Sequence, residues 1–136
     1  MTRIVNIMPM AGLGKRFSDS NYNLPKPLIS IKNKPMFIQA AKSMPKSATN
    51  IFICNKKIAD QFKIKKILLK EFKKNFKLIK IKRTTKGQAN TCLLAKKYLK
   101  KNEKIFIHSC DSFIKFETNN LIKDLETCKD INECIE

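Results

Sequence analysis

The N-terminal residues of the chain predict a buried strand that ends in a glycine loop. A mostly apolar run of strand length, Ile4–Met10, is followed by Ala11 and by a loop that contains Gly12 and Gly14. These are two of the three glycines in the whole chain. Because glycine has no Cβ, backbone N–H groups in such a loop can approach an anion closely. The pattern therefore predicts a strand that positions a phosphate-binding loop.

Cations follow this loop at short spacing. Lys15 and Arg16 come directly after Gly14, and Lys26 stands between Pro25 and Pro27. Positively charged side chains at fixed offsets would add charge-assisted hydrogen bonds to a bound anion. A polyphosphate is the ligand that this arrangement favours. The alternative is an ordinary strand-to-helix turn with solvated lysines.

Two common phosphate loops are excluded by the spacing. A Walker A loop needs a hydroxyl residue after its Gly-Lys pair, whereas Arg16 follows Gly14 and Lys15 here. A dinucleotide-binding fingerprint needs a third small residue where Phe17 stands. It also needs an acid about 20 residues further on, and the stretch Ile29–Lys34 has none.

Segments of strand length alternate with helical patterns along the chain. The predicted strands are Ile4–Met10, Asn50–Cys54, Phe76–Ile81 and Ile105–Cys110, with a short extended piece at Leu28–Ile31. The predicted helices are Pro35–Ser43, an amphipathic stretch capped by Asn55, Gln88–Lys100, and a last helix capped by Thr118 or Asn119. This alternation predicts a Rossmann-like, three-layer α/β/α fold with a mostly parallel sheet, formed as one domain over residues 1–136.

Composition narrows the classes of function. The hydrophobic fraction of 43% is typical of a folded domain. The net charge of +18 comes almost wholly from lysine rather than arginine, and the lysines are spread through the chain, with most of them over Lys56–Lys104. This pattern predicts a weak general attraction for polyanions and no specific nucleic-acid binding. A lysine-rich nucleic-acid-binding module remains an alternative. The five cysteines show no zinc or redox spacing, so we expect free thiols and a cytoplasmic location. No apolar run is long enough to span a membrane.

Three segments together resemble a known family. The segment Ala11-Gly-x-Gly-x-Arg16, the Pro-Lys-Pro-Leu28 segment and the Lys34-Pro-Met36 step are similar to the N-terminal signature of sugar-phosphate nucleotidyltransferases, the sugar-nucleotide pyrophosphorylases. The form Met8–Phe17 resembles the bacterial capsule and lipopolysaccharide subgroup most. The resemblance implies that NMP passes from an NTP to a phosphorylated acceptor, with release of pyrophosphate and with Mg²⁺ as cofactor.

The resemblance also implies a role for each candidate residue. The nucleotide-binding residues would be Ala11, Gly12, Gly14 and Lys15 at the phosphates, with Gly87 and Gln88 at the base. The catalytic residues would be Arg16, at the departing pyrophosphate, and Lys26, at the α-phosphate. Asp111 would hold the metal. On its own, Asp111 could equally be a turn residue or the partner of a lysine. Likewise, the loop at Gly87 could simply need a positive φ before a helix.

The resemblance covers only the N-terminal half of the family. The second half, which carries the acceptor pocket and a further carboxylate, is expected to be absent from residues 1–136. A truncated, non-catalytic nucleotide-binding remnant is therefore a second hypothesis, and an exposed sheet edge leaves self-association open. The acceptor expected first is a hexose 1-phosphate, followed by phosphocholine-like or other capsule phosphates. The sequence does not select the nucleotide base.

Overall fold

The strand β1 (Ile4–Met10) lies inside the molecule, and all of its side chains are buried. The computed structural model describes residues 3–12, 24–46 and 48–127. On one side, β1 pairs in parallel with β4 (Thr49–Asn55), which pairs in turn with β5 (Phe76–Ile81). On its other side, β1 pairs in parallel with β6 (Lys104–Ile107), so the sheet has the order β5-β4-β1-β6.

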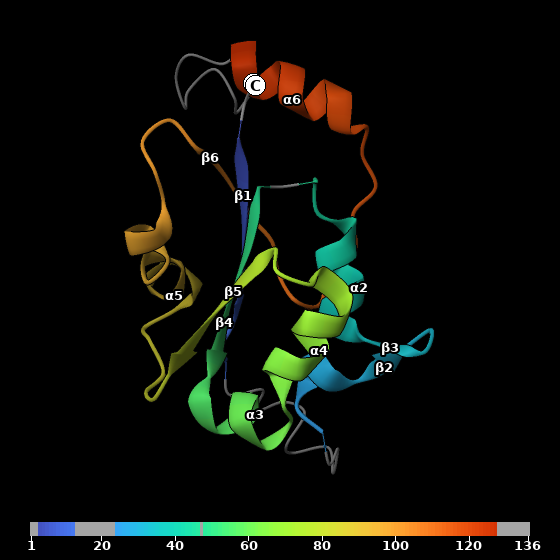
Figure 1. The fold of residues 1–136 in the computed structure, drawn as a ribbon, viewed down its shortest axis with the longest axis vertical. Helices are drawn as coiled ribbons and strands as arrows, with labels where there is room; N and C mark the ends of the chain where they lie inside the picture. Colours follow the sequence, from blue (N-terminus) through green and yellow to red (C-terminus); the bar gives the residue numbers. More distant parts are fainter. Residues whose placement is uncertain (1–2, 13–23, 47, 128–136) are drawn as a thin grey trace.

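Helices cover both faces of this sheet (Figure 1). The helices α2 (Met36–Ser43), α3 (Lys56–Gln61) and α4 (Ile64–Phe72) enclose one core cluster, which includes Phe37, Phe52 and Leu68. The helix α5 (Gln88–Leu93) and the 3-10 helix η2 (Lys96–Tyr98) belong to the opposite face, where Val5, Ile7, Ile51, Ile53 and Ala95 form a second cluster. The predicted three-layer α/β/α fold with a parallel sheet is therefore confirmed.

Smaller elements complete the fold. The 3-10 helix η1 (Lys26–Leu28) precedes a hairpin of β2 (Ser30–Ile31) and β3 (Lys34–Pro35). Glu71 on α4 accepts hydrogen bonds from Lys34, at 2.9 and 3.0 Å, and pairs with Lys42 on α2 at 2.5 Å. These contacts hold the hairpin and two helices together. After β6 the chain leads to α6 (Thr118–Thr127), at the opposite end of the sheet from the hairpin (Figure 1).

Two predicted helices differ from those observed. The amphipathic stretch after Asn55 forms two helices, because Lys63 adopts a left-handed conformation with φ 51° between them. The predicted cap is confirmed, since the Asn55 side chain accepts from the backbone N–H groups of Lys57 and Ile58 at 2.9 and 3.4 Å. The predicted helix 88–100 is instead α5 followed by η2.

This shorter helix α5 also presents a different face to the core. Helical spacing predicts that Ala89, Leu93, Leu94 and Ala95 face inward. Ala95 is buried as predicted and Thr91 is buried as well, whereas Leu93 is 64% exposed. The Thr91 side chain bonds back to the loop before the helix, as described below, which sets the rotation of the first turn.

The strand order places a change of direction beside β1. From β1 the chain adds β4 and then β5 on one side, and it returns to add β6 on the other side. In open α/β sheets, ligands bind outside the carboxyl ends of the strands at such a switch point. The residues that follow β1 and β6 are therefore candidates for a ligand-binding site.

Candidate functional site

Bare backbone follows β1 at the switch point. Ala11 is buried, and the next residue, Gly12, is exposed. A Cβ added to Gly12 would meet no heavy atom within 4 Å, so the chain itself does not require glycine there for space. The open volume is what close approach of a ligand to the backbone would need. The predicted phosphate contacts Gly14, Lys15 and Arg16 lie outside the described residues.

Lys26 reaches this edge from a short helix. Pro25 caps η1 with φ −56° and ψ 143°, and its carbonyl accepts from the Leu28 N–H at 2.9 Å. Prolines on both sides of Lys26 restrict the backbone before and after it. The Lys26 ammonium then forms an ion pair with the Asp111 carboxylate, a residue 85 positions further along the chain. Both side chains are about one-third exposed, at 32% and 33%.

Asp111 lies in a turn that is attached to β1. The backbone N–H of His108 donates to the Ile7 carbonyl at 3.0 Å, which continues the pairing of β6 with β1. Nε2 of the buried His108 ring lies 2.9 Å from the Ser112 carbonyl oxygen, so the imidazole closes the turn around Asp111. Ser109 Oγ donates to Asp111 Oδ1. The Lys26 ammonium, and after it the Ser109 hydroxyl, hold the pKa of Asp111 below its ordinary value.

Gly87 adopts a conformation that favours glycine. Its φ is +141° and it caps α5, which packs against β1. Its carbonyl accepts from the Thr91 N–H and the Thr91 hydroxyl, both at 3.1 Å, and from the Thr85 hydroxyl at 3.0 Å. Gln88 is the exposed first residue of α5. Because this loop follows the carboxyl end of β5, Gly87 and Gln88 lie towards the same edge of the sheet as Gly12.

A second charged cluster occupies the carboxyl ends of β4 and β5. Asp60 on α3 pairs with Lys56 at 2.6 Å and with Lys80 at 2.5 Å. Hydrogen bonds from Lys56 and then Lys80 lower its pKa to about 2. A shallow hollow beside it is lined by Asn55, Lys56, Lys57, Asp60 and Lys82. This cluster lies between two strands that follow each other in the chain, away from the switch point.

Asp111 is chemically suited to one kind of metal. Within residues 3–12, 24–46 and 48–127, no group of three or more His, Cys, Asp or Glu side chains is placed to hold an ion. A site with one carboxylate suits Mg²⁺, which keeps several waters and takes further oxygen ligands from phosphates. The lowered pKa keeps Asp111 ionised, and Gly12 leaves open space beside β1. The residues present therefore fit magnesium bound together with a phosphate ligand.

The fold and its switch point define a doubly wound α/β protein, and sequence comparison identifies the family. Residues 6–133 match the nucleotidyl transferase family, so the chain belongs to that family. A comparison with curated protein sequences finds no significant match.

Solved structures share the fold at low sequence identity. A Bacillus anthracis protein described as a glucose-1-phosphate thymidylyltransferase is 16% identical, with a TM-score of 0.76, over 93% of this chain and 51% of that one. The T. maritima inositol-1-phosphate CTP transferase is 17% identical, with a TM-score of 0.72, over 96% and 51%. A nucleoside-diphosphate-sugar pyrophosphorylase from Vibrio cholerae is 21% identical, with a TM-score of 0.65, over 86% and 52%. The chain thus spans about half the length of these proteins.

The structure brings together some of the predicted site residues and adds others. Lys26 and Asp111 form an ion pair, and Gly12 follows β1, the strand that pairs with β6, which precedes Asp111. Sequence reasoning did not assign Ser109 a role; its hydroxyl two residues before a candidate carboxylate was the available signal.

Among the helices that the structure describes, none has the length and hydrophobicity of a membrane span.

Proposed function

We propose that this chain supplies the NTP-binding part of a nucleotidyltransferase that passes NMP to a phosphorylated acceptor and releases pyrophosphate. The observation that supports the proposal most is the ion pair of Lys26 with Asp111, which follows β6, at the switch point where Gly12 follows the neighbouring strand β1. A cation, an ionised carboxylate and open backbone are the three groups that a metal-bound triphosphate needs.

Each residue has a proposed part in this reaction. An oxygen of the acceptor phosphate attacks the α-phosphorus in line, and the bond from that phosphorus to pyrophosphate breaks. The backbone from Ala11 to Gly14, with Lys15, binds the phosphates; Lys26 neutralises charge at the α-phosphate; and Arg16 holds the leaving pyrophosphate. Gly87 and Gln88 lie against the base. Positioning and charge neutralisation are what the protein contributes to phosphoryl transfer.

Asp111 is the proposed Mg²⁺ ligand, with Ser109 and His108 holding its turn in place. When bound, the ion would neutralise negative charge on the phosphates. Since Lys26 now pairs with this carboxylate, we propose that Lys26 exchanges Asp111 for a phosphate oxygen when Mg²⁺ and NTP bind. The ion pair would then keep both groups ionised and in place until the ligand arrives.

Residues 1–136 are proposed to be the nucleotide-binding part, with the acceptor pocket supplied from outside them. The chain covers 51–52% of the three solved proteins described above. On β6, Ile105 and Ile107 are 47% and 55% exposed, which leaves apolar surface for further structure or for self-association. The proposed acceptor is a sugar 1-phosphate used for nucleotide-sugar and cell-surface polysaccharide synthesis in the cytoplasm. Capsule-type phosphates such as phosphocholine are tested next.

The test measures binding and turnover separately. Isothermal titration with each NTP, with and without Mg²⁺, gives affinity, and pyrophosphate release with a panel of sugar phosphates gives activity. Asp111→Asn should weaken Mg²⁺-dependent NTP affinity by at least about tenfold, as expected for loss of a charged ligand. Asp60→Asn removes a similarly paired carboxylate outside the site and should leave the affinity unchanged.

The outcomes separate two functions from a wrong assignment of the site. Mg²⁺-dependent binding with pyrophosphate release supports the nucleotidyltransferase. Binding without turnover for any acceptor assigns nucleotide binding alone. If Asp111→Asn and Asp60→Asn behave alike, the site is elsewhere and the proposal is wrong.

A further inference from the structure

The outer strand β5 presents a free edge. It pairs with β4 along its whole length, and no other strand in the described ranges pairs with its outer side. An edge strand carries outward-pointing backbone N–H and C=O groups that can pair with another extended chain. This edge lies at the far side of the sheet from β6, so it does not depend on the proposed catalytic site.

Grooves lined by apolar side chains and lysines flank this edge. One groove, of about 470 Å³, is lined by Leu69 on α4, by Leu78 on β5 and by Lys65, Lys74 and Lys77, and it extends to Tyr98 on η2. On the α5 side, a second groove has Leu93 and Leu94 beside Lys96 and Lys97. Leu69 and Leu93 are 47% and 64% exposed. Apolar surface and positive charge therefore alternate along the same strand.

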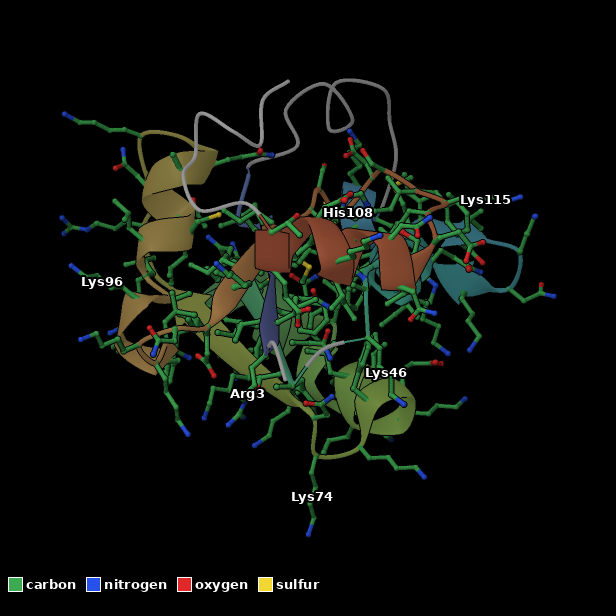
Figure 2. All side chains as sticks on the ribbon, turned by 90° about the horizontal axis from the view of Figure 1, so that it is seen from above. Arg3, Lys46, Lys74, Lys96, His108 and Lys115 are labelled. Carbon is green, nitrogen blue, oxygen red and sulfur yellow. The ribbon has the colours of Figure 1, made fainter. Side chains whose placement is uncertain are left out.

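The charge of these grooves is unbalanced. No carboxylate lines either one, and Lys80, which lines both, is the lysine that pairs with Asp60. The Tyr98 ring centre lies 4.9 Å from Lys77 Nζ and 5.1 Å from Lys97 Nζ, which are two of the lysines that line the grooves. Figure 2 shows Lys74 and Lys96 pointing outward on different sides of the molecule. An occupant of this edge must therefore be anionic.

We propose that β5 binds an extended acidic segment of a partner protein by strand addition. In this mode, main-chain hydrogen bonds to the strand edge give affinity, and alternate side chains fill the flanking grooves. A segment in which pairs of acidic residues alternate with pairs of apolar residues offers both kinds of side chain to each groove, because successive side chains of a strand point to opposite faces. A single-stranded nucleic acid matches less well, because it would use the lysines but would find one exposed aromatic ring, Tyr98, on which to stack.

The probe is a short fluorescein-labelled peptide in which glutamate pairs alternate with valine pairs, and the readout is fluorescence anisotropy with the full chain. The same peptide with N-methyl groups on alternate amides keeps the charge and removes backbone donors, and oligothymidylate tests a nucleic acid. We expect the unmodified peptide to bind at least about tenfold more tightly than the N-methylated one, since several main-chain hydrogen bonds are lost.

Matched charge reversals locate the binding site. Lys77→Glu, on β5, should weaken peptide binding about tenfold, because one attraction becomes a repulsion. Lys101→Glu changes the net charge equally, in an exposed turn before β6, and should have little effect. Circular dichroism confirms that both variants fold. The proposal is wrong if the two peptides bind equally, if the two variants have equal effects, or if oligothymidylate binds more tightly than the peptide. It is also wrong if the peptide does not bind, in which case the lysines only protect the edge from aggregation.

Discussion

Two aspartates at the same edge of the sheet have similar electrostatics and different surroundings. Asp60 and Asp111 each accept hydrogen bonds from lysine, and each has a lowered pKa. The partners of Asp60 are Lys56, one helical turn away, and Lys80 on the strand that follows. Asp111 instead pairs with Lys26, which is 85 positions distant, and it follows the strand β6, which neighbours β1.

The comparison shows that a lowered pKa does not by itself identify a ligand site. Both carboxylates are ionised at neutral pH, and a lysine-rich surface provides ion pairs at many places. What separates Asp111 is its place after β6 at the change of strand order, with a cation from a distant segment, Lys26, beside it. Asp60 therefore serves as an internal control for every experiment on Asp111.

The largest expected effect comes from removing Lys26, the lysine partner of Asp111, with the removal of Lys80, a lysine partner of Asp60, as the control. Lys26→Met should weaken NTP binding about tenfold to a hundredfold, as expected for loss of a charge-assisted hydrogen bond to phosphate. Lys80→Met should leave NTP affinity unchanged, because Lys80 pairs with Asp60. Equilibrium binding measures both. A similar loss in the two variants would mean that general positive charge, rather than this site, attracts the nucleotide.

A smaller effect separates two glycines. Gly12→Ala should weaken NTP binding about tenfold while changing the free energy of unfolding by less than about 0.5 kcal/mol, because the new Cβ meets no atom of the chain. Gly87→Ala should instead cost about 1–3 kcal/mol of stability, because its φ of +141° strains any other residue. Urea unfolding and titration of NTP check the pair. Normal nucleotide binding by Gly12→Ala would remove Gly12 from the phosphate site.

The smallest expected effect is a shift in the pKa values of Asp60 and Asp111, which NMR of the carboxyl carbons can measure. Both folded-state pKa values are depressed, so any stability that these groups contribute is present above their unfolded pKa and is lost as pH falls through the folded one. For Asp60 the loss should fall between about pH 4 and pH 2. Lys56→Met should raise the pKa of Asp60, and Lys26→Met that of Asp111.

Addition of Mg²⁺ and NTP distinguishes the two titrations. The pKa of Asp111 should fall further, since a bound cation favours the ionised carboxylate, while that of Asp60 stays at about 2. A shift at Asp60 alone would place the ligand in the lysine cluster between β4 and β5.

The sequence predicted the strands of the sheet better than the helices around it. The bounds of β1 match its apolar run, because a strand buried between layers needs such a run, and the bounds of the outer strand β5 are also as predicted. The break at Lys63, where φ is 51°, and the end of α5 at Leu93 were not predicted. Hydrophobic periodicity alone continues through both points.

The candidate site was predictable for a different reason. A glycine after one predicted strand and an aspartate after another lie at the same edge of any parallel sheet, so Gly12 and Asp111 were expected near each other. The pairing of Lys26 with Asp111 follows no sequence spacing and needed coordinates. The same holds for the His108 and Ser109 contacts that fix the turn.

The most direct test of the central claim is paramagnetic broadening by Mn²⁺, used in place of Mg²⁺ with a saturating NTP. The backbone amide signals of Gly12 and Asp111 should disappear at the lowest Mn²⁺ concentrations, while that of Asp60 persists, and Asp111→Asn should abolish the difference. Broadening centred on Asp60, or equal broadening at both aspartates, would contradict a metal-bound triphosphate at the switch point.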